Sequence, residues 1–75
     1  MIKTHEPTTR PTLKEAQAMV GGYVVMAVNQ PDQQILVDED GLAKQLPIND
    51  KVSLIASQRL VGNAIILKGD AMWVD

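Results

Sequence analysis

The pattern of apolar and polar residues changes its period several times along the chain. Apolar residues recur at helical spacing over residues 12–20, which predicts a short amphipathic helix. Residues 23–28 are apolar throughout and rich in β-branched side chains. Such a run is typical of a central strand that is covered on both faces. Gly21 and Gly22 separate the two periods.

The first helix has a sequence signal at each end. Thr12 and Glu15 have the spacing of a capping box, in which each side chain accepts a hydrogen bond from the other residue's amide. Gly21 suits the left-handed conformation that ends many helices. A helix of about two turns is unstable alone in water. We therefore expect it to pack against a sheet.

A hairpin is predicted after this helix. Residues 31–32 suit the centre of a turn, because proline presets its φ and aspartate favours the next position. This turn connects strand 23–28 to a second strand at residues 34–38. Residues 38–41 form the next turn, and Gly41 is expected to adopt a positive φ.

A second helix is predicted over residues 50–60, with Asn49 as its N-cap. Asp50 at its start and Arg59 near its end both favour the helix dipole. Gly62 is expected to stop it. Its predicted buried stripe consists of Val52, Ile55, Ala56 and Leu60.

The remaining segments predict further strands. Residues 42–46 allow a short one, and residues 64–67 a stronger one. Residues 69–70 have the glycine-first form of a two-residue hairpin loop, which would lead into a last strand at 71–74. The predicted fold class is α+β. Two short helices pack on a small antiparallel sheet of four to five strands, in the order α-β-β-(β)-α-β-β.

The predicted domain organisation is simple. Residues 1–11 hold threonines and prolines with one apolar side chain after Met1, so we expect a flexible N-terminal arm. His5 is interpreted as a solvated residue of this arm. Residues 12–75 form a single α+β domain.

The two helix–glycine–strand joints, around Gly21 and around Gly62, resemble each other. One interpretation is an old duplication with approximate twofold symmetry. The other is that any helix-to-strand joint requires such a stop. The sequence leaves both open.

Composition narrows the class of protein. The chain has no cysteine and one histidine, which excludes disulfides and thiolate metal sites. A net charge of −2 and a pI near 5.1 argue against nucleic-acid binding, which needs a basic stripe. No run is long and apolar enough for a signal peptide or a membrane span. We expect a cytoplasmic protein, and a homodimer because small cores are marginal.

Candidate catalytic and metal-binding groups are sparse. Asp38, Glu39 and Asp40 cluster, but apolar and basic residues follow where a calcium loop needs oxygen ligands, so a solvated turn is the expected reading. Ser53 lies near Lys51 without a nucleophile motif. The sequence therefore predicts a protein that is not an enzyme, with no catalytic residues, cofactor or metal.

Partner-binding candidates come from two groups of residues. Tyr23 and Trp73 are the only aromatic residues, and such side chains often dominate interfaces, although burial in the core is an equal alternative for Trp73. Polar side chains near the first hairpin tip offer hydrogen bonds to a partner or ligand. The alternative is that they are ordinary loop residues. They are Asn29, Gln30, Asp32 and Gln34.

Several sequence blocks carry a family resemblance: LKEAQ, VGGY, VDEDG, LPIN and VGNAIILKG. In this order, over roughly residues 12–74, they resemble a small family of unknown function found mostly in bacteriophages and in prophage or plasmid regions of bacterial genomes. The chain departs from the family pattern because its second helix lacks a tyrosine-containing end. No catalytic residue transfers from the family. The resemblance implies an accessory protein of a mobile element.

Two functional hypotheses follow. The first is a non-enzymatic phage-type accessory protein that binds a host protein, in the host cytoplasm, and inhibits or sequesters a host defence component. It would act through a sheet edge or the hairpin tip. The alternative is a sponge for a small signalling molecule such as a nucleotide, with a pocket at a subunit interface.

Overall fold

The computed structural model describes residues 2–74 and contains two helices and four strands. In chain order they are β1 (Thr4–His5), α1 (Leu13–Val20), β2 (Val24–Asn29), β3 (Gln34–Asp38), α2 (Asp50–Ala56) and β4 (Ala64–Leu67), followed by a 3₁₀ turn, η1 (Gly69–Ala71). The predicted α+β class is confirmed.

The four strands form one sheet in the order β1-β4-β3-β2. The β2–β3 and β3–β4 pairs are antiparallel, whereas β1 runs parallel to β4. The sheet is therefore mixed, and the prediction of a purely antiparallel sheet is wrong in this respect. The sequence did not predict the parallel pairing of β1 with β4, because the N-terminal residues carry no strand-like apolar pattern.

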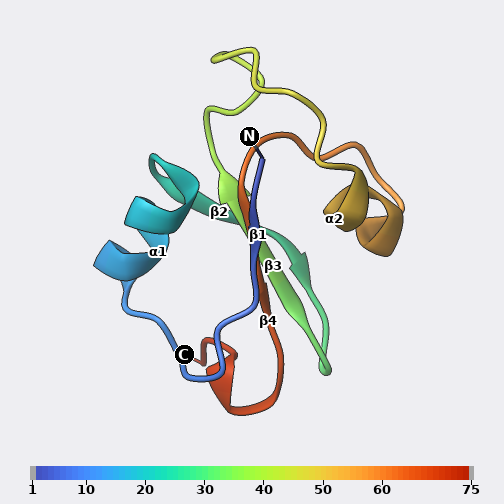
Figure 1. Cartoon of the computed structure of the whole chain (residues 1–75). Coiled ribbons are helices and arrows are strands. Elements are labelled where there is room, and N and C mark those ends of the chain that lie inside the picture. Colours follow the sequence, from blue (N-terminus) through green and yellow to red (C-terminus); the bar gives the residue numbers. More distant parts are fainter. Residues whose placement is uncertain (1, 75) are drawn as a thin grey trace.

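The helices lie on opposite faces of the sheet, as Figure 1 shows with the sheet seen nearly edge-on. Every residue of β3 and β4 is buried. These two strands, and not residues 23–28, are covered on both faces. Since β2 is an outer strand with exposed positions, the prediction of a central strand there is wrong. An apolar run does not show whether a second neighbouring strand exists.

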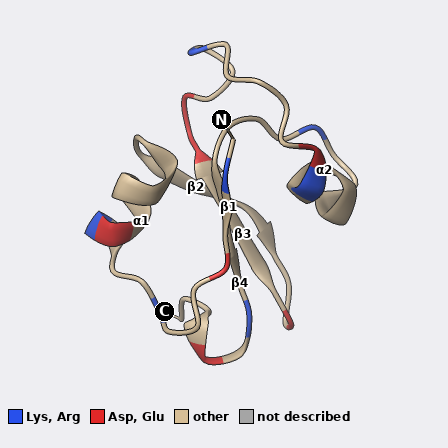
Figure 2. Ribbon diagram, viewed as in Figure 1, with Lys and Arg blue, Asp and Glu red and all other residues tan. Residues whose placement is uncertain are grey.

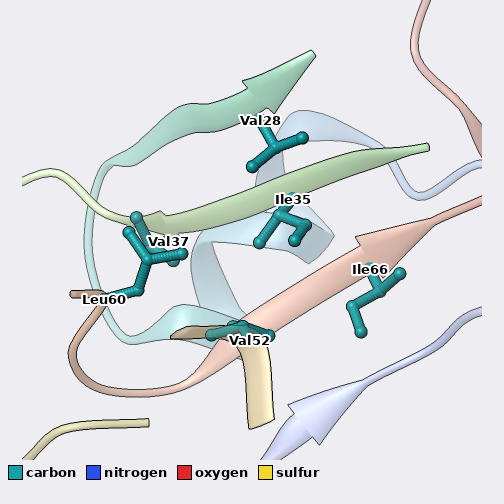
Figure 3. Close-up of a cluster of buried hydrophobic side chains, with 7 residues drawn as sticks. Val28, Ile35, Val37, Val52, Leu60 and Ile66 are labelled. Atoms are coloured by element: carbon teal, nitrogen blue, oxygen red, sulfur yellow. The ribbon is translucent and has the colours of Figure 1, made fainter. Parts of the chain in front are cut away.

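Alternation along β3 and β4 divides the core into two clusters. Ile35 and Val37 point to the side of α2, where Val52 and Leu60 cover them (Figure 3). Leu36 points to the other side, which α1 covers. The α2-side cluster comprises Val28, Ile35, Val37, Val52, Leu60, Ala64 and Ile66. The α1-side cluster comprises Ala16, Val20, Leu36, Ile65, Leu67 and Ala71.

The caps of α1 are those that the sequence predicts. Thr12 Oγ1 accepts from the Glu15 amide at 3.1 Å, and the Thr12 amide donates to Glu15 Oε1 at 2.8 Å. Gly21 ends the helix at φ 84°, in the left-handed region. Both predictions are confirmed.

The second helix is shorter than predicted. Asn49 caps it as expected, because its Oδ1 accepts from the Val52 amide at 3.3 Å. The helix ends at Ala56, since Ser57 adopts a left-handed φ of 55°. The chain then turns back, so Leu60 reaches the core while Ile55 stays 41% exposed. The predicted stripe is therefore wrong at Ile55.

The loop after β3 contains turns and no strand at residues 42–46. Gly41 does not have the expected positive φ; that conformation falls on Gln45, at 57°. A glycine is needed at position 41 for another reason. A Cβ there would lie 2.8 Å from Val61 Cγ2, too close for a real contact.

The C-terminal segment also differs from the prediction. Residues 69–71 form η1, and residues 72–74 are not a strand. The second half therefore has no hairpin after its strand, and α2 ends well before Gly62. The structure does not reproduce the repeated unit that a duplication requires.

Residues 2–11 are not separated from the domain as an arm. The Lys3 amide donates to Asn63 Oδ1 at 2.9 Å, and the Ala64 amide donates to the Lys3 carbonyl at 3.0 Å. Thr4 contacts the buried Asn49 side chain through its hydroxyl. Polar contacts, rather than apolar burial, attach this segment, which explains why its composition suggested an arm. Met1 lies outside the described residues.

Leu36→Ala is expected to lower the free energy of unfolding by about 2–5 kcal/mol, because it leaves a cavity under α1. Leu54→Ala is the matched control, since Leu54 is 81% exposed on α2. It should change stability by less than about 0.5 kcal/mol. Urea unfolding followed by circular dichroism measures both, and equal effects would contradict the assigned core.

Deleting residues 1–6 is expected to lower the free energy of unfolding by about 1–3 kcal/mol, because the hydrogen bond from Lys3 to Asn63, the contact of Thr4 with Asn49 and the pairing of β1 with β4 are lost. Thermal unfolding of the truncated and full-length chains measures this. Glu6→Gln, which removes only an exposed ion pair with Lys51, should change little. An unaltered midpoint for the truncated chain would show that these residues are an arm after all.

Candidate functional site

The structure brings three of the six predicted binding residues together. Asn29, Gln34 and Trp73 line one cavity at the end of the sheet. Gln30 and Asp32 lie exposed at the nearby hairpin tip, outside that lining. Tyr23 precedes β2 at the opposite end of this strand and is 67% exposed. The six residues thus belong to two separate surfaces.

The cavity has a volume of about 490 Å³ and lies between three segments of the chain. These are the residues before α1, the β2–β3 hairpin and the C-terminal residues after η1. Its lining consists of Arg10, Pro11, Met26, Asn29, Gln34, Trp73 and Val74. A cavity of this size falls within the range of small-ligand pockets.

Gln34 fixes the C-terminal wall of the cavity. Its Oε1 accepts from the Trp73 amide at 2.7 Å, and its Nε2 donates to the Trp73 carbonyl at 2.8 Å. Nε2 also lies 3.3 Å from Asn29 Oδ1. Because Gln34 is buried and pairs with the backbone of Trp73, residues 72–74 do not need a neighbouring strand to satisfy these groups.

The N-terminal wall is tied to the C-terminal wall by two further hydrogen bonds. Arg10 Nε donates to the Met72 carbonyl at 2.7 Å. Trp73 Nε1 donates to the Pro11 carbonyl at 3.0 Å. Arg10 is not among the site residues predicted from the sequence, because residues 1–11 were expected to form an arm. The one available signal was Pro11, which fixes the chain directly before the helix cap.

The second surface is the outer edge of β2. The Glu39 amide donates to the Tyr23 carbonyl at 2.8 Å, so the backbone groups of Tyr23 face β3. By the alternation of an antiparallel ladder, Val24 and Met26 turn their N–H and C=O groups outward. The register shifts between Met26 and Val28, and Gln58 Nε2 donates to the Ala27 carbonyl at 3.3 Å.

Apolar side chains accompany the open half of this edge. Val25 pairs with Val37 on the α2 side and is 41% exposed. Beside it lies a hollow of about 190 Å³, whose lining includes Val25, Val37, the exposed Leu42 and Val61. Figure 2 shows that β2 carries no charged residue along its length.

An ion pair supports the Tyr23 end of this edge. Lys44 Nζ lies 2.7 Å from Asp38 Oδ2, and the Asp40 amide donates to Asp38 Oδ1 at 2.8 Å. The hydrogen bond from Lys44 lowers the pKa of Asp38 below its ordinary value, against the opposing effect of burial; the Asp40 amide lowers it further. Asp38 is therefore a buried structural carboxylate, and the acidic turn is not wholly solvated as expected.

The described residues offer little for covalent or metal chemistry. Among residues 2–74 there is no group of three His, Cys, Asp or Glu side chains that could hold a metal ion. Ser53 Oγ accepts from the Leu60 amide at 2.9 Å and donates to the Leu60 carbonyl at 3.0 Å, so it fixes the turn after α2. No helix in the described part of the chain is long and apolar enough to cross a membrane.

Fold and surfaces together define a small α+β domain with a mixed four-stranded sheet, an open sheet edge and one cavity between its chain ends. The chain belongs to the family described as "Domain of unknown function (DUF3846)", whose model matches residues 1–74. The expected membership of a family of unknown function is thereby confirmed. Searches of curated proteins and of solved structures found no match.

Acid is expected to weaken the loop that Asp38 holds. Because the folded-state pKa of Asp38 is depressed, its stabilisation is present above its unfolded-state pKa, about 4, and is lost as pH falls through the lower folded value. Asp38→Asn should be less stable than the wild type at pH 7 and should lose less stability between about pH 5 and pH 2. Urea unfolding over this range measures the difference, and parallel pH profiles for the two proteins would contradict it.

Proposed function

We propose that the protein is a non-enzymatic accessory binding protein of the bacteriophage type, which binds an extended strand of a host protein along the edge of β2. Binding in this way would inhibit or sequester the host component, and a component of host defence is the favoured target. The observation that carries the proposal is the open, uncharged edge of β2 with two exposed apolar side chains, Tyr23 and Val25.

Strand addition matches the backbone geometry of this edge. The outward N–H and C=O groups of Val24 and Met26 provide two donors and two acceptors in one line. An extended segment that pairs with them continues the sheet beyond β2. Main-chain hydrogen bonds then supply affinity, and alternate side chains supply specificity.

Natural sheets normally protect their edges with lysine, proline, bulges or covering segments. Half of β2 is protected in this way, because the bulge at Ala27 and the Gln58 side chain occupy its later part. The half from Tyr23 to Met26 contains no lysine or proline. Because one half of the edge is protected and the other half is open, the open half is more consistent with a specific docking site than with non-specific aggregation.

The hollow beside Val25 indicates the chemistry of the incoming strand. In antiparallel addition the residue opposite Val25 belongs to a non-hydrogen-bonded pair, in which side chains lie close together. Its side chain points to the α2 side, next to a hollow whose lining is mainly apolar, with Val37, Leu42 and Val61 among its residues and with Asp38, Glu39 and Arg59 also present. A β-branched or other compact apolar residue is expected at that position of the partner.

The bacteriophage origin is supported by the resemblance of the sequence blocks described above, and the family match adds no activity that would favour an enzyme. A binding role suits a domain of 75 residues whose described surface includes an open sheet edge and a cavity. The same edge allows a second copy to pair with itself, because Val24 of one copy can face Met26 of the other. The test therefore distinguishes a host protein from a second copy.

Val25→Lys is expected to abolish capture of the host protein, because a charge would replace the apolar contact at the centre of the open edge. Leu54→Lys is the matched control, since it makes the same change at an exposed leucine on α2. Wild-type, Val25→Lys and Leu54→Lys baits are compared by affinity capture and mass spectrometry. Hydrogen exchange on the purified complex should show new protection at the Val24 and Met26 amides.

Three outcomes would overturn this proposal. The captured protein is retained by the Val25→Lys bait, or the two amides exchange as fast in the complex as in the free protein. Alternatively, sedimentation shows that the wild type is a dimer, Val25→Lys is a monomer and no host protein is captured. In that last case the edge serves self-association.

A further inference from the structure

We infer that the cavity at the end of the sheet is a binding site for a small organic anion with a flat apolar body. This inference does not rest on strand addition at the β2 edge. The cavity shares neither Tyr23 nor Val25 with that edge, and Met26 is the one residue that belongs to both. The ligand would carry a carboxylate or a phosphate group, since both present negatively charged oxygen atoms to hydrogen-bond donors.

The cavity walls are fixed before any ligand arrives. Gln34, which is 4% exposed, holds the Trp73 backbone at both its amide and its carbonyl. The Pro11 carbonyl holds the indole N–H. Two hydrogen bonds, from Arg10 to Met72 and from Trp73 to Pro11, thus connect segments from the two ends of the chain, and the two from Gln34 attach the C-terminal segment to β3. A prearranged wall reduces the ordering cost of binding.

The polar side-chain groups left for a ligand are hydrogen-bond donors. Arg10 uses Nε for the Met72 carbonyl, and the described structure records no hydrogen bond from its two terminal nitrogens. Asn29 uses Oδ1 to accept from Gln34, which turns its Nδ2 donor away from that contact. Two donors, one of them cationic, favour an oxyanion over a cation or a neutral acceptor.

The electrostatic surroundings agree with this assignment. The two ion pairs among residues 2–74 are Lys44–Asp38 and Lys51–Glu6, and neither involves Arg10. No carboxylate from those residues lines the cavity. As far as residues 2–74 are concerned, the guanidinium is therefore available for bidentate contact with a carboxylate or phosphate.

The rest of the lining determines the body of the ligand. Pro11, Met26, Trp73 and Val74 contribute apolar surface. Since the indole N–H is already paired with Pro11, the ring contributes a flat apolar wall and no further donor. A planar ring carrying the anion complements such a wall through stacking and apolar contact.

Trp73 is the single tryptophan, so tryptophan fluorescence reports on this wall of the cavity and on the α1-side cluster against which Trp73 packs. Adenosine monophosphate tests the phosphate source and phenylacetate tests the carboxylate source. Adenosine and phenylacetamide are their uncharged counterparts. We expect at least one of the two anions to change the Trp73 emission in a saturable manner. Its uncharged counterpart should bind roughly tenfold more weakly or worse, because the charge-assisted hydrogen bonds are lost.

Arg10→Gln is expected to weaken binding of that anion by roughly tenfold or more. Lys14→Gln removes one positive charge from an exposed site on α1 that lies outside the cavity, and should leave affinity within about twofold. Circular dichroism and the melting temperature show whether each variant folds. If Arg10→Gln does not fold, the test uses the NMR spectrum of the N–H groups of the wild-type protein instead of the variant. The Trp73 indole and Asn29 side-chain N–H signals should then shift with the anion, while the Gln17 side-chain signals stay.

The inference is overturned if neither anion changes the emission up to about 10 mM, a range that covers even weak sites. It is also overturned if the uncharged compounds bind equally well, or if folded Arg10→Gln binds as the wild type does. Loss of host-protein capture with intact anion binding would count against the β2-edge proposal alone. The reverse result would count against the cavity alone.

Discussion

The antiparallel pairing of β3 with β4 is the contact on which the rest of the molecule depends. All nine residues of these strands are buried, and their alternation sends apolar side chains to both faces of the sheet. Each short helix packs on a separate apolar cluster: α1 covers Leu36 and Ile65, and α2 covers Ile35 and Ile66. Helices of this length do not persist alone in water. The central strand pair is therefore what makes both of them stable.

Three buried polar side chains attach the remaining segments to this core. Gln34 holds the C-terminal residues, Asn49 holds the N-terminal strand and Gly62, and Asp38 holds the loop after β3 through Lys44. Each has its hydrogen bonds satisfied in the described structure, which recovers the free energy that burial of a polar group would otherwise cost. The sequence has no cysteine, so disulfides cannot hold the long irregular segments in place. The buried polar side chains order these segments instead.

The two candidate surfaces lie at opposite ends of β2 and use different chemistry. At the Tyr23 end the surface consists of open backbone groups and exposed apolar side chains. At the Asn29 end it consists of a cavity with a cation and amide donors. The first suits an extended polypeptide and the second a small anion. Both arise because β2 pairs with β3 on one side only, so that its outer side has no neighbouring strand.

The sequence by itself determined the local elements. The capping box at Thr12, the left-handed Gly21, the Asn49 cap and the strands at residues 34–38 and 64–67 depend on neighbouring residues, and all are confirmed. For the candidate site, the sequence identified polar and aromatic side chains by their chemistry, but it did not show which of them share a surface. Asn29, Gln34 and Trp73 share a cavity, while Tyr23 lies at the other end of β2.

The tertiary structure alone decided which strand is outermost, where the chain ends attach and why Arg10 belongs to a site. These features depend on contacts between residues far apart in the chain, such as Gln34 with Trp73 and Arg10 with Met72. A run of apolar residues predicts burial but not the number of strand neighbours, which is why residues 23–28 looked central. Residues 2–11 looked like an arm because polar hydrogen bonds, unlike apolar periodicity, leave no pattern in the sequence from which a partner can be inferred.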